Sequence, residues 1–279
     1  MYEYTGKKGK FSSNIMCDEG NTVIFMLLVI DVGNSNIAFG IYHDDKLIET
    51  FRLRTDETYT FDELGLLISQ YLIFSKIDRE DIKAVMMASV VPKMISTLKE
   101  AIRKYFSIEP LVAGGNVKIN IKNLYQNPEQ TGVDRLINAV QAVRKYGNSL
   151  IIIDMGTATT IDAISSNGEF AGGVIMPGID ILSEILAEKT AKLPAIELSK
   201  PTNIIGRTTL ECIQSGVYYG YLGAIEGILL NMKLKLAGNV KVIATGGLAK
   251  YLLEGIENID FIDETLTLDG LKYIYDSQA

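Results

Sequence analysis

Asp31 and Asp154 each end an apolar run, and a glycine follows each two residues later, at Gly33 and Gly156. Glycine lets a backbone come close to a phosphate, and successive backbone N–H groups form a concavity that binds anions. A carboxylate beside such a turn is suited to hold a cation that screens phosphate charge. One isolated Asp-x-Gly is an ordinary turn, but two copies in matched contexts favour a pair of phosphate-binding turns.

A third glycine-rich segment, Thr245-Gly246-Gly247, ends the apolar run that begins at Val242. Glycines at this point would let a flat adenine lie against the backbone, although a tight strand-to-helix turn has the same pattern. The sequence contains no Walker A pattern, no GxGxxG and no protein-kinase HRD motif. An ATP site in this chain would therefore be built from paired hairpins.

Asp134 stands in the first turn of an expected helix, with Arg135 beside it. The helix dipole favours an acidic residue there, so a purely structural role is one interpretation. The other is a carboxylate that accepts a proton from a substrate hydroxyl during phosphoryl transfer. In a loose transition state the proton leaves late, so position matters more than basicity.

The elements that must position these residues form a weak internal repeat. Each Asp-x-Gly strand is followed by a second β-rich run, a turn rich in Asp, Asn or Gly, and a third strand. Helical patterns follow, the first behind Pro92. We expect an α/β fold with two ribonuclease-H-like (actin-like ATPase) domains, residues 26–147 and 148–279, around an interdomain cleft. Residues 1–25 are expected to be a poorly ordered extension.

Composition narrows the possible functions. The chain has 279 residues, a net charge of −7, one histidine and two cysteines without metal-ligand spacing. The negative net charge argues against a nucleic-acid partner. The single histidine argues against a Ser-His-Asp triad and against a His-rich metal site. The apolar runs are shorter than a bilayer span. We expect a cytoplasmic protein that does not enter a membrane.

With these motifs in order, the sequence resembles the type III pantothenate kinases, members of the acetate/sugar kinase–Hsp70–actin superfamily. The resemblance runs from about Met26 almost to the C-terminus. It is carried by the segments Asp31–Asn36, Ser89–Pro92, Tyr125 with Asn127–Glu129, Gly132–Arg135, Asp154–Thr157, Gly206–Thr209 and Thr245–Gly247.

The resemblance implies ATP-dependent phosphorylation of pantothenate to 4′-phosphopantothenate, the first step towards coenzyme A. It also implies Mg²⁺, a monovalent cation (potassium or ammonium) and a homodimer. Asp134 matches the family's proton acceptor, Asp154 its monovalent-cation ligand, and Asp31 lies near Mg²⁺. The ATP contacts would be Asp31, Val32, Gly33, Asn34, Ser35, Asn36, Ile37, Ala38 and Thr157. The pantothenate contacts would be Tyr125, Gly132, Val133, Asp134, Arg135 and Thr209.

Two further segments have open interpretations. The first is a segment that precedes a long helical stretch and contains Arg207, Thr208 and Thr209. Its basic side chain and hydroxyls would either bind a carboxylate or amide group or cap the helix. Within that stretch, Gly216 to Gly227 include four glycines at helical spacing, which favours an interdomain or dimer-interface helix over an ordinary core helix.

Other functions fit the same fold. One alternative is a nucleotide-binding accessory or regulatory protein without turnover, which the intact Asp31, Asp154 and Asp134 disfavour. A small-molecule kinase with another hydroxyl substrate is a second. An actin-like polymerising protein is a third, disfavoured by the short chain.

Overall fold

The computed structural model describes residues 17–18, 21–22, 25–190, 193–194, 196–252 and 258–278. The predicted poorly ordered extension, residues 1–25, lies outside these ranges except at Phe25 and at two short strands. These strands, β1 (Cys17–Asp18) and β2 (Asn21–Thr22), pair antiparallel.

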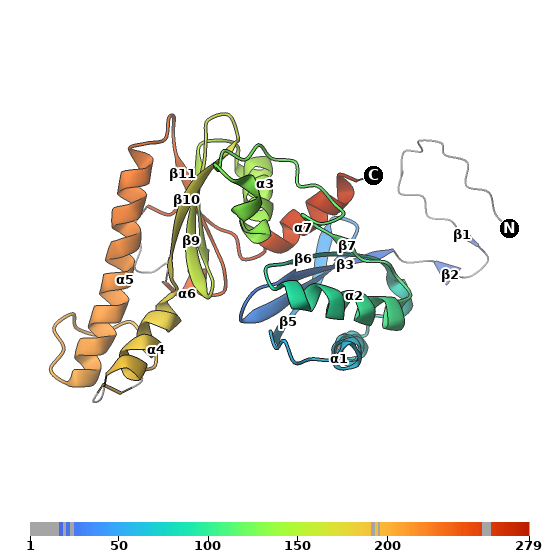
Figure 1. Cartoon of the computed structure of the whole chain (residues 1–279), viewed down its shortest axis with the longest axis horizontal. Helices are drawn as coiled ribbons and strands as arrows, with labels where there is room; N and C mark the ends of the chain where they lie inside the picture. The colour runs from blue at the N-terminus through green and yellow to red at the C-terminus, as the bar shows by residue number, and fades with distance from the viewer. Residues whose placement is uncertain are drawn as a thin grey trace. The chain divides into compact units, whose positions relative to one another are not determined.

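The chain divides into two compact units (Figure 1). One unit runs to Lys118 and takes in the C-terminal stretch from Leu271, and the other is Ile119–Gly270. This division differs from the predicted boundary at residue 147. The reason is that helix α3 (Val133–Tyr146) packs its buried Ala139 and Ala142 on the second sheet, so it folds with the strands that follow it.

The first unit contains a five-stranded mixed sheet with the order β5-β4-β3-β6-β7. Its strands β3, β4 and β5 form an antiparallel meander, and β6 and β7 add parallel to β3. Parallel neighbours need a crossover, and helices supply it here. The strands are β3 (Met26–Val32), β4 (Asn36–His43), β5 (Lys46–Arg54), β6 (Ile82–Ser89) and β7 (Leu111–Val112).

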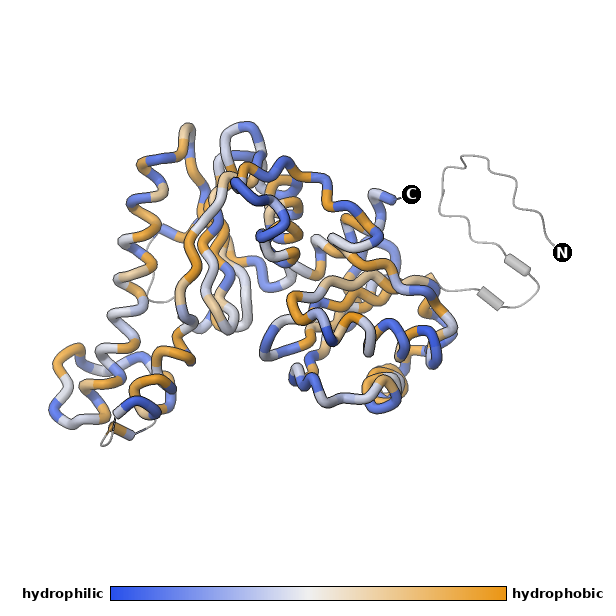
Figure 2. The backbone as a smooth tube through the Cα atoms, in the orientation of Figure 1, coloured by the Kyte–Doolittle hydropathy of each residue, from blue (hydrophilic) through white to orange (hydrophobic). Residues whose placement is uncertain are grey.

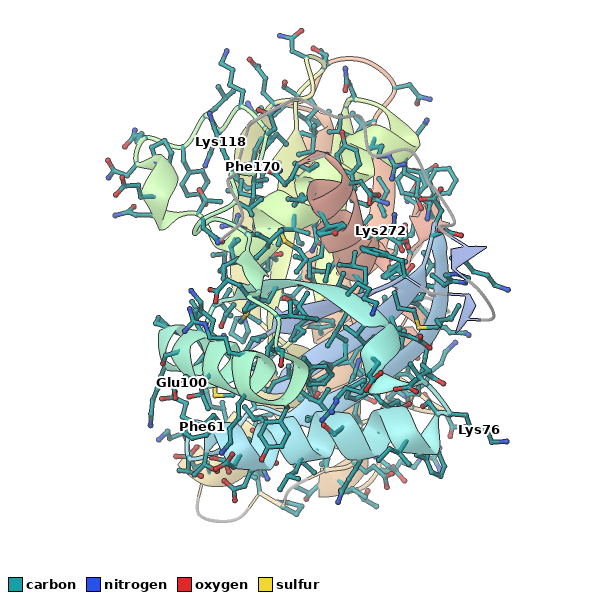
Figure 3. All side chains as sticks on the ribbon, turned by 90° about the vertical axis from the view of Figure 1, so that its right-hand side faces the viewer. Phe61, Lys76, Glu100, Lys118, Phe170 and Lys272 are labelled. Carbon is teal, nitrogen blue, oxygen red and sulfur yellow. The ribbon has the colours of Figure 1, made fainter. Side chains whose placement is uncertain are left out.

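Two helices lie side by side over one face of this sheet (Figures 1 and 3). Helix α1 (Phe61–Phe74) begins at a capping box between Thr60 and Glu63, and the short 3-10 turn η1 (Arg79–Asp81) follows it. Helix α2 (Pro92–Phe106) has proline at its first position, as predicted. The core beneath them is formed by alternate residues of β3 and by the apolar sides of both helices: Leu28, Ile30, Val32, Leu64, Ile68, Leu98 and Ile102.

The second unit repeats the topology, with the sheet order β10-β9-β8-β11-β12 and the same parallel and antiparallel pairs. The predicted internal repeat and α/β class are therefore confirmed. In Figure 2 hydrophobic residues run along these strands, with polar turns between them. The strands are β8 (Leu150–Met155), β9 (Ala158–Ile164), β10 (Phe170–Pro177), β11 (Lys241–Thr245) and β12 (Phe261–Ile262).

Alternate residues of β8 point to opposite faces of this sheet, and each face has its own helices. Ile151 and Ile153 pack with α4 (Ile179–Lys189), α5 (Thr209–Lys233) and α6 (Ala249–Leu252). Leu150 and Ile152 pack with α3 and with Leu266, the first residue of α7 (Leu266–Asp276). By the same alternation, Asp154 points to the α3 face. Among the described residues, no helix is long and apolar enough to cross a membrane.

Candidate active site

Helix α3 begins after Gly132, directly in front of the predicted base. Asp134 lies in the first turn, and its Oδ1 accepts a hydrogen bond of 2.8 Å from the Arg135 backbone N–H. A Cβ placed on Gly132 would come within 2.5 Å of that Oδ1. The Gly132 backbone, at φ −55° and ψ 136°, suits any residue, so the glycine is needed for space and not for its torsion angles.

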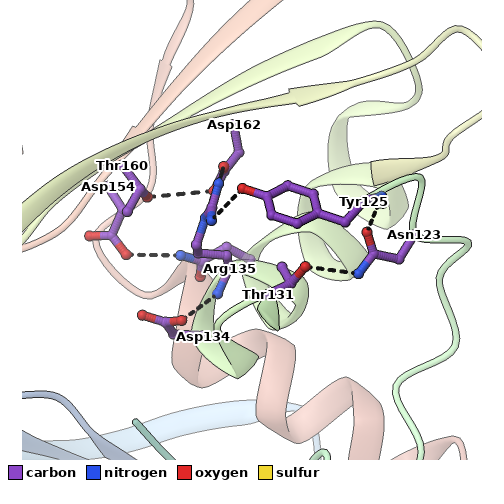
Figure 4. Close-up of polar contacts among 9 residues, drawn as sticks. Asn123, Tyr125, Thr131, Asp134, Arg135, Asp154, Thr160 and Asp162 are labelled. Carbon is purple, nitrogen blue, oxygen red and sulfur yellow. Dashed lines mark hydrogen bonds and ion pairs between the residues drawn. The ribbon is translucent and has the colours of Figure 1, made fainter. Parts of the chain in front are cut away.

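The Arg135 side chain points in the opposite sense, into the sheet, and is only 5% exposed (Figure 4). Its Nε lies 3.0 and 3.1 Å from the two carboxylate oxygens of Asp162, and its Nη2 also donates to Asp162. Its Nη1 donates to the Tyr125 hydroxyl at 3.1 Å. The guanidinium carbon is 5.6 Å from the Tyr125 ring centre and 5.4 Å from that of Phe170, close enough for cation–π attraction.

The sheet register brings three polar side chains to the α3 face. Asp154 on β8 is paired with Thr160 on β9, and Asp162 follows two residues later on the same face. Asp154 Oδ2 accepts a hydrogen bond of 2.9 Å from the side-chain amide of Asn138 on α3. The Thr267 hydroxyl donates a hydrogen bond of 2.7 Å to the side-chain oxygen Oδ1 of Asn138. This contact fixes the amide so that its NH₂ group faces Asp154.

The cluster contains three carboxyl groups, those of Asp134, Asp154 and Asp162, and one strong cation, Arg135. Burial raises the pKa of Asp134, although the Arg135 backbone N–H and charge oppose the rise. Burial also raises the pKa of Asp162, again against the effect of Arg135. Asp154 keeps some solvent exposure. Desolvation of its carboxylate by the surrounding protein nevertheless raises its pKa to about 6, and the charge of Asp134 adds to the rise. Arg135 is committed to Asp162, so Asp134 and Asp154 lack a comparable counter-charge in the described part of the chain.

The two Asp-x-Gly turns have the structure that the repeat predicts, each within its own unit. Asp31 lies near the end of β3, and the turn that follows exposes residues 34–36. Thr55 closes this turn, since its side chain donates to the Gly33 carbonyl at 2.7 Å and its backbone N–H to the Ser35 carbonyl at 2.9 Å. The turn after Asp154 likewise exposes residues 156–158.

The third glycine-rich segment, Thr245–Gly247, packs against the turn that follows Asp154. Thr245 ends β11 beside Asp154, and Gly246 follows with a φ of +95°. A Cβ on Gly246 would lie 2.6 Å from the backbone N and O of Met155. This glycine is required both by its torsion angle and by the close approach of the two backbones.

The family model for type III pantothenate kinase matches residues 27–231, which is most of the chain. The chain belongs to the type III pantothenate kinase family. Its activity is therefore that of a phosphotransferase of the pantothenate kinase type, with ATP and pantothenate as the substrates that the family uses.

Several solved structures of other proteins share the fold. One is a protein from Campylobacter jejuni named as a Baf family transcriptional activator, 22% identical over 90% of this chain and 98% of that one, with a TM-score of 0.55. Another is component A of (R)-2-hydroxyglutaryl-CoA dehydratase from Acidaminococcus fermentans, 14% identical over 91% and 98%, with a TM-score of 0.50. A third, from Listeria monocytogenes, is named as an N-acetylmannosamine kinase and is 14% identical over 91% and 99%, also at 0.50. At these identities the likeness concerns the fold alone.

Some of the residues predicted to bind pantothenate lie together in the structure, and one of them lies elsewhere. Tyr125 and Arg135 are in contact, next to Asp134. Thr209, by contrast, is exposed at the start of α5, on the opposite face of the sheet from α3. Thr208 caps that helix by accepting a hydrogen bond from the Glu211 N–H at 3.2 Å, as one of the two interpretations anticipated.

Sequence reasoning missed Asp162 and Asn138, which complete the cluster around Arg135 and Asp154. A signal for Asp162 was present. Thr160 and Asp162 alternate with apolar residues in a strand, so both had to lie on one face together.

The space at Gly132 gives a test of how Asp134 is positioned. We expect Gly132→Ala to lower kcat by about 10-fold or more, because the new methyl group displaces the Asp134 carboxylate. Thermal unfolding should change little, since the backbone angles suit alanine. Steady-state kinetics and a melting curve together check this, and an unchanged kcat would show that Asp134 does not need its observed position.

Proposed function

We propose that the protein transfers the γ-phosphoryl group of ATP to the 4′-hydroxyl of pantothenate and forms 4′-phosphopantothenate, the first intermediate towards coenzyme A. Asp134 is the proton acceptor in this reaction. The observation that carries the proposal is the carboxylate of Asp134 at the start of α3, beside an arginine that is itself fixed by Asp162 and Tyr125.

The roles follow from the chemistry of phosphoryl transfer, which needs positioning and charge stabilisation more than a strong base. Asp134 accepts the hydroxyl proton as the bond to phosphorus forms. Arg135 and Tyr125 offer donors to the oxygens of pantothenate, and Gly132 and Val133 border them at the helix start. The exposed turn residues 34–36 and 156–158 offer backbone N–H groups to the phosphates of ATP.

Two cations complete the proposal. Mg²⁺ is commonly held by one or two carboxylates together with substrate phosphates, and Asp31 at the end of β3 suits this use. Among the described residues, no group of three acidic, histidine or cysteine side chains is arranged so that it could hold a metal ion. Asp154 suits a monovalent cation, because its carboxylate is hydrogen-bonded by an amide and lacks a basic partner among the described residues. A cation bound there would offset the charge of Asp134 and Asp154.

The reaction is tested by ADP release with millimolar ATP and Mg²⁺, with and without pantothenate. Potassium, ammonium and sodium are compared at equal ionic strength. We expect release that depends on pantothenate and that requires potassium or ammonium. Folded protein that binds ATP but shows no pantothenate-dependent release under any cation would favour an accessory protein, or a kinase with another hydroxyl substrate.

We infer that the protein forms a homodimer through helix α5. Four glycines and two leucines recur at intervals of four and three residues and are all exposed: Gly216, Gly220, Gly223, Gly227, Leu230 and Leu234. Apart from its chain neighbours and the nearby backbone of α5, a Cβ on any of the four glycines would meet no described atom within 4 Å. Thr209 on the same helix matches the family's pantothenate site but lies away from Arg135, which supports a site completed by a second copy.

The open glycines allow the homodimer to be tested without disturbing the fold. We expect the double variant Gly220→Ala, Gly223→Ala to weaken dimerisation by about 10-fold or more, because the methyl groups hold two helices apart. The monomer should be stabilised, by about 0.5–1 kcal/mol per glycine replaced within the helix. Light scattering across a dilution series checks this. A wild type that is monomeric at micromolar concentration, or a variant that dimerises as tightly, would contradict the α5 interface.

A further inference from the structure

Asp162 is the most deeply buried carboxylate of the site, with 2% of its surface exposed. It belongs to none of the motifs that carry the resemblance to the family. Both of its oxygens face Arg135, at 3.0 and 3.1 Å from Nε, and Thr160 on the same strand lies 3.5 Å from Oδ2. Its position is therefore directed to Arg135 and not to solvent or to a substrate.

The contacts decide which edge of the guanidinium remains available. Arginine has five N–H donors in a rigid plane. Asp162 engages the edge formed by Nε and Nη2, and Tyr125 takes one N–H of Nη1. Among the residues that the structure describes, one N–H on each terminal nitrogen has no hydrogen-bond partner, and neither points at Asp162. A planar group held along one edge cannot turn without breaking two hydrogen bonds to a carboxylate.

The strand next to Asp162 leaves room for this arrangement. Gly173 on β10 is the register partner of Asp162 on β9. A Cβ on Gly173 would lie 2.4 Å from Asp162 Oδ1, so any side chain there would push the carboxylate away from Arg135. The rings of Tyr125 and Phe170, whose centres are 5.8 Å apart, hold the guanidinium from other directions.

We propose that Asp162 is a positioning residue for the acceptor substrate: it fixes Arg135 so that the remaining N–H groups of the guanidinium meet oxygen atoms of pantothenate. The proposal rests on the proposed function, since it assigns Asp162 to the affinity for that substrate. Asp162 acts through Arg135 and touches neither ATP nor the transferred phosphoryl group. Its loss therefore affects the KM for pantothenate and leaves the KM for ATP unchanged.

The first test replaces Asp162 by asparagine, which keeps the shape and removes the charge. We expect the KM for pantothenate to rise by about 10-fold to 100-fold, the range for losing a hydrogen-bonded partner of a charged group. The KM for ATP should stay within about 2-fold. The matched control is Asp263→Asn, because buried Asp263 also pairs with a basic residue of α3, Lys145 at 2.8 Å, at the other end of the helix. That variant should lose stability without a change in either KM.

A double-mutant cycle with Arg135→Met separates positioning from structural support. If Asp162 acts through Arg135, adding Asp162→Asn to Arg135→Met should cause no further loss in kcat/KM for pantothenate. The double variant should also unfold at a higher temperature than Arg135→Met alone, which leaves a buried carboxylate without its partner. This comparison holds even if Asp162→Asn alone does not fold.

Two results would overturn the proposal: a folded Asp162→Asn enzyme with the wild-type KM for pantothenate, or an additional loss when the two substitutions are combined. A wild-type enzyme that turns over ATP with a different hydroxyl substrate, and not with pantothenate, would contradict the proposed function instead. The same cycle measured with that other substrate would then test whether Asp162 positions Arg135.

Discussion

Replacing Asp134 with asparagine is expected to lower kcat by about 10²-fold to 10⁴-fold, the usual contribution of a positioned general base. Asparagine has nearly the shape of aspartate, and its oxygen can still accept the hydrogen bond from the Arg135 N–H. The variant should therefore fold, and it loses only the capacity to accept a proton. Single-turnover kinetics and a melting curve measure the two effects separately.

The pH dependence of turnover by the wild type is a second test of Asp134. Asp134 must be ionised to accept a proton, and burial raises its pKa above the ordinary value of 3.8. Turnover should therefore decline as the pH falls through this raised pKa, and the residual activity of Asp134→Asn should lack that decline. Turnover of the asparagine variant at the wild-type rate would rule out Asp134 as the base. Asp269→Asn, on α7 in the same unit, is a suitable control substitution.

The strands, their turns and the repeat could be predicted because their signals are local. Apolar runs that end in Asp-x-Gly, followed by Asp- or Gly-rich turns, specify antiparallel meanders in each half. The structure has the same sheet order in both units, with Asp31 and Asp154 at matching places on their strands. The start of α3 at Val133 could also be predicted from the sequence, because an acidic residue such as Asp134 is favoured in a first helical turn.

The contacts that organise the site could not be predicted in the same way. Arg135 and Asp162 are separated by 27 residues, and they meet because α3 covers one face of the second sheet at a particular register of β8 and β9. The sequence shows that Asp162 shares a face with Thr160, but not which helix covers that face. The unit boundary before Ile119 has the same cause, because tertiary packing assigns α3 to the strands that follow it.

Replacing Asp154 with asparagine is expected to remove the response to potassium or ammonium and to stabilise the protein in their absence. The raised pKa of Asp154, about 6 against 3.8, means that its ionised form is unfavourable in the folded chain. That difference corresponds to about 3 kcal/mol, and partial solvent exposure reduces it to an expected 1–3 kcal/mol at neutral pH. Asparagine carries no charge, and it keeps an oxygen for the Asn138 amide.

The sign of the pH dependence distinguishes this effect from a general loss of charge. A carboxyl whose pKa is higher in the folded state binds a proton on folding, so stability rises as the pH falls from about 7 through 6 towards 3.8. We expect this gain in the wild type without potassium or ammonium, and a smaller gain in Asp154→Asn. Potassium should raise the melting temperature of the wild type at neutral pH, because it offsets the charge that burial penalises. Choline chloride at equal ionic strength controls for screening. A variant that potassium stabilises as much as it does the wild type would place the monovalent cation at some carboxylate other than Asp154.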